Sequence, residues 1–269
     1  MLLPSSSIYT VGDLKFLLFD HDGGPESSSV KAGYLWDHHV TEMANMLLDS
    51  QSSALANGCV IDVGAHLGTF SIPVARKYPE LVIHAFEPQQ AVLYQLCGSI
   101  LLNRISNVAV SSLGVSSEKD MLIVRLPDYY ADDNNCGAFS FDNTVLRQSD
   151  RVFGGELSSM HVDTLDSRSI TNVRLIKLDV EGHELDVLKG AQNTLKQSGY
   201  PPIIFEAWRD LDWYEPRRQE LFLFLETLGY EISNIALREY QGTQDYVAQH
   251  TFNKLLHISP EGYQLSTKL

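Results

Sequence analysis

The chain has 269 residues, 44% of them hydrophobic, a share typical of a globular domain that buries its own core. No apolar run approaches the ~20 residues that span a bilayer, and the first residues lack the basic and apolar regions expected of a secretory signal. The net charge of −14 without any Lys/Arg cluster argues against a nucleic-acid partner, and three scattered cysteines, Cys59, Cys97 and Cys136, indicate neither a disulfide framework nor a metal site but a reducing, cytoplasmic compartment.

The front of the chain, residues 1–57, is expected to cap the core domain formed by residues 58–269. Turn residues and apolar spacing predict two short strands within 8–20, a loop over 21–29 and a helix within 34–56.

From residue 58 on, short apolar strands alternate with helices, the pattern of a mostly parallel sheet covered by helices on both faces. The fold class is therefore α/β, Rossmann-like and doubly wound. The predicted strands are 59–63, 81–86, 108–110, 121–126, 173–179, 202–206, 230–232 and 252–258, and the predicted helices are 69–78, 89–102, 184–197 and 217–228.

This alternation stops within an insertion at about residues 127–157. Its polar segment 127–137 is long for a loop in a compact domain, and such loops are usually functional or disordered. Aromatic and amide side chains suit sugar faces and hydroxyls, so the segment is interpreted either as an acceptor-binding lid or as an acidic loop without function. The lid candidates are Tyr129, Tyr130, Asp132 and Asn135.

The turn after the first core strand is the expected cofactor site. Gly64 and Gly68 let the backbone approach a ligand, and Glu87 ends the next strand, where a carboxylate accepts ribose hydroxyls. The spacing of these glycines departs from the G-x-G-x-x-G of dinucleotide sites. Asp62 would also face a pyrophosphate badly but suits the cationic methionine end of S-adenosylmethionine. The candidate cofactor-binding residues are Asp62, Gly64, His66, Gly68, Thr69, Glu87, Ser112 and Asp179.

Three motifs together resemble the FkbM-type methyltransferase family over roughly residues 58–206. They are Val60–Ser71, Ala85–Pro88 and Ile176–Glu184, the last continuing through Leu185, Leu188, Lys189, Gly190 and Ala191, and with Phe205-Glu206 beyond. The resemblance implies S-adenosylmethionine as cofactor, a seven-stranded sheet with an antiparallel last strand, and O-methylation of a hydroxyl. Acceptors in this family include sugar and polyketide hydroxyls.

Acidic residues gather where methyl transfer to an alcohol needs a base. Asp179, Glu181 and His183 follow one strand, and Glu206 ends another, so we expect the four to converge at one edge of the sheet. His183 is the most natural general base among them, because its ordinary pKa lies near neutrality. Asp179 or Glu181 is the alternative base, and Asp179 with Glu206 holding Mg²⁺ or Mn²⁺ is the third possibility. Lys177 is expected to neutralise Asp179.

The sequence thus predicts an S-adenosylmethionine-dependent O-methyltransferase that acts on a sugar, glycan or similar small polar acceptor. The alternatives are an NAD-dependent oxidoreductase, a non-catalytic cofactor-binding protein, and a methyltransferase with a protein or other non-sugar acceptor. Retention of Asp62, Glu87, Asp179 and Glu206 argues against loss of catalysis.

Overall fold

The computed structural model describes residues 3–52, 55–132, 134–140, 142–148, 153–235, 243–259 and 262–265. Its centre is a seven-stranded sheet in the order β11-β12-β10-β9-β3-β4-β5, in which β12 alone runs antiparallel to both of its neighbours. The α/β prediction and the single antiparallel strand are confirmed. The strands are β3 (Cys59–Val63), β4 (Val82–Phe86), β5 (Val108–Ser111), β9 (Val173–Leu178), β10 (Ile203–Trp208), β11 (Tyr230–Asn234) and β12 (Thr243–His250).

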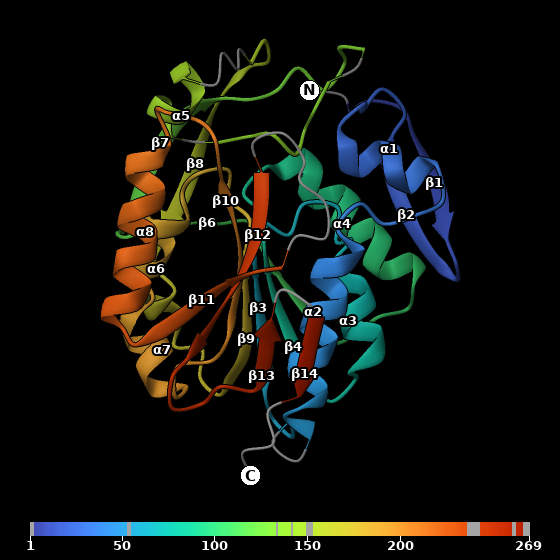
Figure 1. Cartoon of the computed structure of the whole chain (residues 1–269). Helices are drawn as coiled ribbons and strands as arrows, with labels where there is room; N and C mark the ends of the chain where they lie inside the picture. Colours follow the sequence, from blue (N-terminus) through green and yellow to red (C-terminus); the bar gives the residue numbers. More distant parts are fainter. Residues whose placement is uncertain are drawn as a thin grey trace.

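Helices cover both faces of this sheet (Figure 1). Successive side chains of β3 point to opposite faces of the sheet. Ile61 and Val63 pack in the hydrophobic cluster that includes residues of α6, α7 and α8, whereas Val60 packs in the cluster that includes residues of α2 and α3. All three are almost fully buried. The covering helices are α2 (His38–Asp49), α3 (Ser71–Lys77) and α4 (Gln90–Leu102) on one side, with α6 (Glu184–Lys189), α7 (Gln192–Gln197) and α8 (Glu215–Thr227) on the other.

The chain order creates a switch point between β3 and β9. The chain runs outward from β3 through β4 to β5, and then returns to build β9 and β10 on the opposite side of β3. Connections from β3 and β9 therefore leave in opposite directions, which opens a crevice beyond their carboxyl ends.

The N-terminal strands form a hairpin, β1 (Ser6–Val11) and β2 (Leu14–Phe19), as predicted. The hairpin docks on α4, where Ser99 Oγ accepts from the Leu17 N–H at 3.0 Å and Gln95 Oε1 accepts from the Phe19 N–H at 2.6 Å. The prediction of a loop over 21–29 is wrong in its second half, because α1 spans Pro25–Lys31. Proline is favoured in a first helical turn, and this helix buries two of its serine side chains.

Two further expectations need correction. The predicted helix 184–197 divides into α6 and α7 at Gly190, where only glycine fits because a Cβ would lie 2.1 Å from the carbonyl oxygen of Ser116. The last strand of the main sheet along the chain is β12, and not the predicted strand 252–258. That predicted strand lies outside the main sheet, where β13 (Leu256–Ser259) pairs with β14 (Gly262–Leu265) in a separate hairpin. Strand β12 is absent from the predicted strands because its sequence is largely polar. The buried side chain of Gln249, within β12, accepts hydrogen bonds from the backbone N–H groups of Leu255 and Leu256 at 3.0 and 2.9 Å.

The strands on either side of the predicted insertion form a small second sheet. Strand β8 (Leu157–Asp163) lies between β6 (Gly114–Val115) and β7 (Asp120–Arg125), which contains most of the predicted strand 121–126. Helix α5 (Asn143–Gln148) and the short 3₁₀ helix η2 (Asp166–Arg168) complete the described elements.

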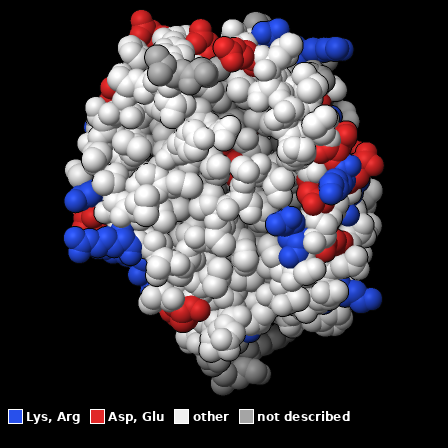
Figure 2. Space-filling model, turned by 180° about the vertical axis from the view of Figure 1, so that it is seen from behind, with Lys and Arg blue, Asp and Glu red and all other residues white. Residues whose placement is uncertain are grey.

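The surface seen from behind has no continuous basic area. Figure 2 shows Lys and Arg side chains in small groups near the edges of this face, mixed with Asp and Glu. A basic footprint for nucleic acid is therefore absent from this face. Every helix within the described ranges is too short or too polar to cross a lipid bilayer.

Candidate active site

A cavity of about 250 Å³ lies at the carboxyl ends of β3, β4, β9 and β10. This is the crevice that the switch point predicts. It is lined by Pro25, Glu26, Trp36, Asp37, Val63, Gly64, His66, Phe86, Glu87, Pro88, Gln89, Leu113, Gly114, Val115, Asn135, Gly137, Ala138, Phe139, Asp179, Val180, Glu181, Glu206 and Trp208.

The floor of the cavity requires glycine at position 64. Gly64 has φ +78°, and a Cβ there would lie 1.8 Å from the carbonyl oxygen of Asp179. The turn after β3 therefore passes directly against the end of β9. Gly68, with φ +84°, closes the same turn against the side chains of Ile72 and Leu96, so it serves packing and does not line the cavity.

Glu87 lies where the sequence analysis expects a ribose-binding carboxylate. It is 3% exposed and lines the cavity at the end of β4. One oxygen accepts the His66 N–H at 3.1 Å and the other accepts the Gln89 N–H at 2.8 Å. Burial raises the pKa of Glu87, although the charge of His66 and these backbone bonds oppose the shift. Ser112 is exposed and outside the cavity wall, while its neighbour Leu113 lines it.

Asp62 lies beneath the turn, fully buried and outside the described cavity lining. Its carboxylate accepts the Ser71 hydroxyl at 2.6 Å, and Lys177 Nζ lies 3.5 Å away. The Lys177 ammonium also donates to Gly64 O at 3.0 Å and pairs with Asp179 at 3.2 Å. Lys177 therefore neutralises Asp179, as predicted, and ties the turn to β9. Burial raises the pKa of Asp62, since Lys177 offsets it only in part.

Three of the four predicted catalytic side chains come together. Asp179, Glu181 and Glu206 all line the cavity. Burial raises the pKa of Glu206 well above its usual range, and the neighbouring charges of Asp179 and Glu181 raise it further. Trp208 Nε1 donates to Glu206 at 3.2 Å. Glu184 supports the segment from below, because one of its oxygens accepts the Val180 N–H at 3.2 Å.

His183, the fourth, does not line either described cavity. Its Nε2 lies 3.0 Å from Ser116 Oγ, and its Nδ1 lies 3.5 Å from the carboxylate of Asp186. Burial lowers the pKa of His183. The His183 ring is therefore held by Ser116 and Asp186, outside both cavities.

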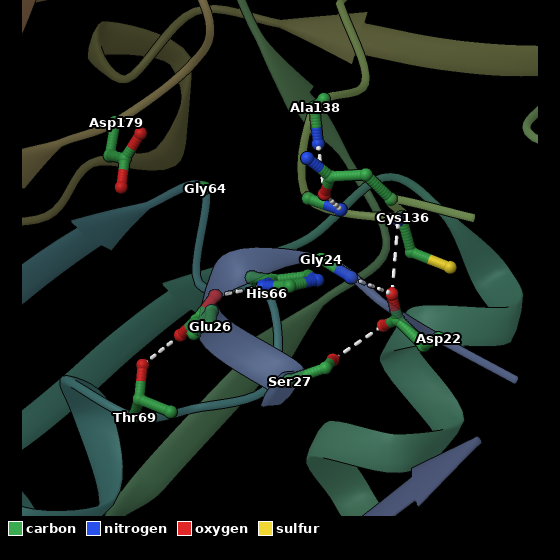
Figure 3. Close-up of polar contacts among 12 residues, drawn as sticks. Asp22, Gly24, Glu26, Ser27, Gly64, His66, Thr69, Cys136, Ala138 and Asp179 are labelled. Carbon is green, nitrogen blue, oxygen red and sulfur yellow. Dashed lines mark hydrogen bonds and ion pairs between the residues drawn. The ribbon is translucent and has the colours of Figure 1, made fainter. Parts of the chain in front are cut away.

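The N-terminal segment supplies cavity residues that the sequence analysis missed. Glu26 on α1 contacts both the His66 ring and the Thr69 hydroxyl, as Figure 3 shows. Trp36 and Asp37 line the same cavity. Burial raises the pKa of Asp37 well above its usual range, helped by nearby carboxylates. In the sequence, only the Gly-Gly-Pro signal before Glu26 marks this region as a sharp turn.

Of the predicted lid residues, Asn135 lines the cavity. Tyr129 is buried and donates to Gln89 Oε1 at 3.1 Å, which fixes the segment beside Glu87. Tyr130 is exposed, and Asp132 pairs with His21 at the surface. The cysteines are free, and Cys59 and Cys136 are buried.

Asp179 and Glu206, the predicted metal ligands, do not belong to a group of three possible ligands among the described residues. Within the described ranges, Asp37, His39 and Asp245 are the group of three whose ligand atoms lie within 4.8 Å of one another, and neither Asp179 nor Glu206 belongs to it. His39 Nε2 and Asp245 Oδ2 are already 2.8 Å apart. A metal at Asp179 and Glu206 stays a prediction.

The sheet order, its one antiparallel strand and the cavity at the switch point are those of a class I methyltransferase fold. The family model "Methyltransferase FkbM domain" matches residues 62–232, and the chain belongs to this family. Methyl transfer from S-adenosylmethionine is accordingly its class of activity, which decides against the oxidoreductase alternative.

Individual relatives are more distant. The chain is 28% identical over 235 residues to methyltransferase sdnD of Sordaria araneosa, covering 77% of this chain and 85% of that protein. It is 27% identical over 158 residues to 31-O-demethyl-FK506 methyltransferase FkbM of Streptomyces tacrolimicus, covering 50% of this chain and 59% of the relative. A solved precorrin-6y C5,15-methyltransferase from Geobacter metallireducens aligns with 13% identity and a TM-score of 0.46, covering 78% of this chain and 88% of that one.

Proposed function

We propose that this chain transfers the methyl group of S-adenosylmethionine to a hydroxyl oxygen of a small polyhydroxylated acceptor, a sugar or glycan. The observation that carries the proposal is the set of carboxylates, Asp179, Glu181 and Glu206, in one cavity beside the cofactor turn. Each carboxyl group accepts hydrogen bonds through its oxygens. A ligand that satisfies them must offer several donors, and a polyol does so without adding charge.

Aromatic walls support the same class of acceptor. Trp36, Phe139 and Trp208 line the cavity together with the carboxylates. Flat aromatic faces pack against the apolar faces of sugar rings, and nearby polar groups fix the orientation of a bound ligand. The name of the relative from Streptomyces tacrolimicus specifies an O-demethyl substrate, which agrees with an oxygen acceptor.

The cofactor is proposed to span the turn after β3. Glu87 takes the ribose hydroxyls, because its two oxygens keep lone pairs beyond those used by His66 and Gln89. The sulfonium then lies over Gly64, whose missing side chain leaves room for close approach. A cofactor bound in this way would present its methyl group to the side of the cavity that carries Asp179 and Glu206.

Transfer is an in-line displacement. A base removes the hydroxyl proton, the oxygen attacks the methyl carbon, and the carbon–sulfur bond breaks to leave neutral S-adenosylhomocysteine. Alignment of the three atoms supplies much of the acceleration. Glu206 is our preferred base, because it lines the cavity and the sulfonium charge would favour its ionised form. Asp179 and Glu181 are the neighbouring alternatives, and His183 would require its ring to leave Ser116.

The test is a screen of polyols, sugars and glycosides with S-adenosylmethionine, followed by mass spectrometry. We expect a gain of one methyl on a hydroxyl oxygen, at a rate that Glu206→Gln reduces. The exposed Glu42, on α2, provides the matched control Glu42→Gln, which should leave the rate unchanged. Methylation of a nitrogen, a carbon or a protein side chain in place of a hydroxyl would overturn the proposal. Activity that persists after exhaustive chelation would remove the Mg²⁺ or Mn²⁺ prediction alone.

A further inference from the structure

Glu26 is an N-terminal residue that reaches the core of the cofactor site. Its side chain is 22% exposed and lies between the His66 ring and the Thr69 hydroxyl (Figure 3). It lines the main cavity and also a smaller adjoining one, whose wall includes Thr69, Lys177 and Asp179. Glu26 is therefore at the end of the cavity nearest β9.

The start of α1 is fixed by its own contacts, so the position of Glu26 does not depend on the pair with His66 alone. The Asp22 carboxylate accepts the Gly24 N–H at 3.1 Å and the Ser27 hydroxyl at 2.5 Å (Figure 3). The Gly23 N–H donates to Asn134 O at 2.8 Å. These bonds hold the first turn of the helix against the segment that forms the opposite cavity wall.

Glu26 and His66 form an ion pair within the cavity wall. Burial alone would raise the pKa of Glu26, but the charge of His66 and the bonds from His66 and Thr69 outweigh it, so the pKa is lowered. Burial alone would lower the pKa of His66, but Glu26 raises it to about 9. Both groups are charged at neutral pH. The second ring nitrogen of His66, Nε2, is buried without an acceptor among the described residues.

The direction of the cofactor follows from the lining residues. With the ribose at Glu87, the base extends towards Leu113 and Gly114, which follow the neighbouring β5. The amino-acid end must then cross Gly64 towards β9. At this end the cavity wall carries the Glu26 carboxylate, whose remaining lone pairs can accept hydrogen bonds from an ammonium group.

From this geometry we infer that Glu26 accepts the α-ammonium group of the methionine portion of S-adenosylmethionine. The inference rests on the proposed use of the cavity for this cofactor and names the residue that binds its amino-acid end. Residues 1–57, expected only to cap the core, thereby complete the cofactor site.

The test compares two ligands that share the nucleoside thioether and differ in the amino acid. S-adenosylhomocysteine carries the α-ammonium group, and 5′-methylthioadenosine lacks the amino-acid end. Calorimetry should show that Glu26→Gln weakens S-adenosylhomocysteine by about 10- to 100-fold, the loss of one charge-assisted hydrogen bond. The affinity for 5′-methylthioadenosine should stay within about twofold of the wild type. Glu42→Gln should bind both ligands as the wild type does.

Each alternative outcome has one meaning. Equal weakening of both ligands would assign Glu26 a structural role and overturn the inference, as would unchanged binding of both. Thr69→Val, which removes the hydroxyl donor to Glu26 and keeps its charge, should weaken S-adenosylhomocysteine less than Glu26→Gln does. Failure of the wild type to bind either ligand would overturn the proposed function itself, and the inference with it.

Discussion

Gly64→Ala tests the close contact on which the cofactor site depends. Position 64 has φ +78°, which costs an alanine about 1–2 kcal/mol. Its Cβ would also lie 1.8 Å from Asp179 O, so the backbone must separate by about 1.2 Å to reach 3.0 Å. Forcing a side chain into packed surroundings costs about 1–3 kcal/mol more. We expect a total loss of about 2–5 kcal/mol in the free energy of unfolding.

Gly12→Ala is the matched control for this substitution. Gly12 has φ +59° in the β1–β2 turn, and a Cβ there would meet no described atom within 4 Å, so alanine costs the backbone term only, about 1–2 kcal/mol. Denaturant unfolding measures both losses, and calorimetry measures S-adenosylhomocysteine binding. Equal destabilisation by the two variants, with wild-type binding by Gly64→Ala, would refute the proposed contact between the turn and β9.

The remaining predictions concern the ribose, the base and the pH dependence. Glu87→Gln should weaken S-adenosylhomocysteine and 5′-methylthioadenosine alike by about tenfold in calorimetry, because both contain the ribose; selective loss of one would contradict the ribose assignment. Glu206→Gln should lower kcat by about 100-fold or more while His183→Ala retains most of it, and the opposite ranking in steady-state kinetics would make His183 the base. His66 has a pKa raised from 6.5 to about 9, so it stabilises the fold fully below pH 6.5 and loses that contribution as the pH rises through 9. Between pH 6.5 and 9 the free energy of unfolding of the wild type, measured by denaturant titration, should thus fall by up to about 3 kcal/mol more than that of His66→Gln. An equal pH dependence of the two proteins would contradict the charged pair.

Local sequence signals account for one half of the site. Gly64 and Glu87 belong to a strand-turn-helix pattern whose chemistry depends on residues close together in the chain. Both line the cavity, and their binding of the cofactor stays a prediction. Asp179, Glu181 and Glu206 each follow a parallel strand, and parallel strands deliver their carboxyl ends to one edge.

The other half depends on tertiary packing that no local pattern encodes. Glu26 and Asp37 reach the cavity because the hairpin docks on α4 and carries α1 back over the turn. His183 shares its segment with Glu181, but Glu181 adopts φ +53° and the following backbone directs the ring to Ser116. The alternation of side chains along a strand does not predict that the His183 ring points to Ser116 and not into the cavity.

The most direct test of the account is the structure of the chain with S-adenosylhomocysteine bound. We predict the ribose hydroxyls on Glu87, the sulfur over Gly64 facing Glu206, and the α-ammonium group on Glu26. A cofactor bound in another cavity, or bound here with its sulfur directed away from Glu206, would contradict it.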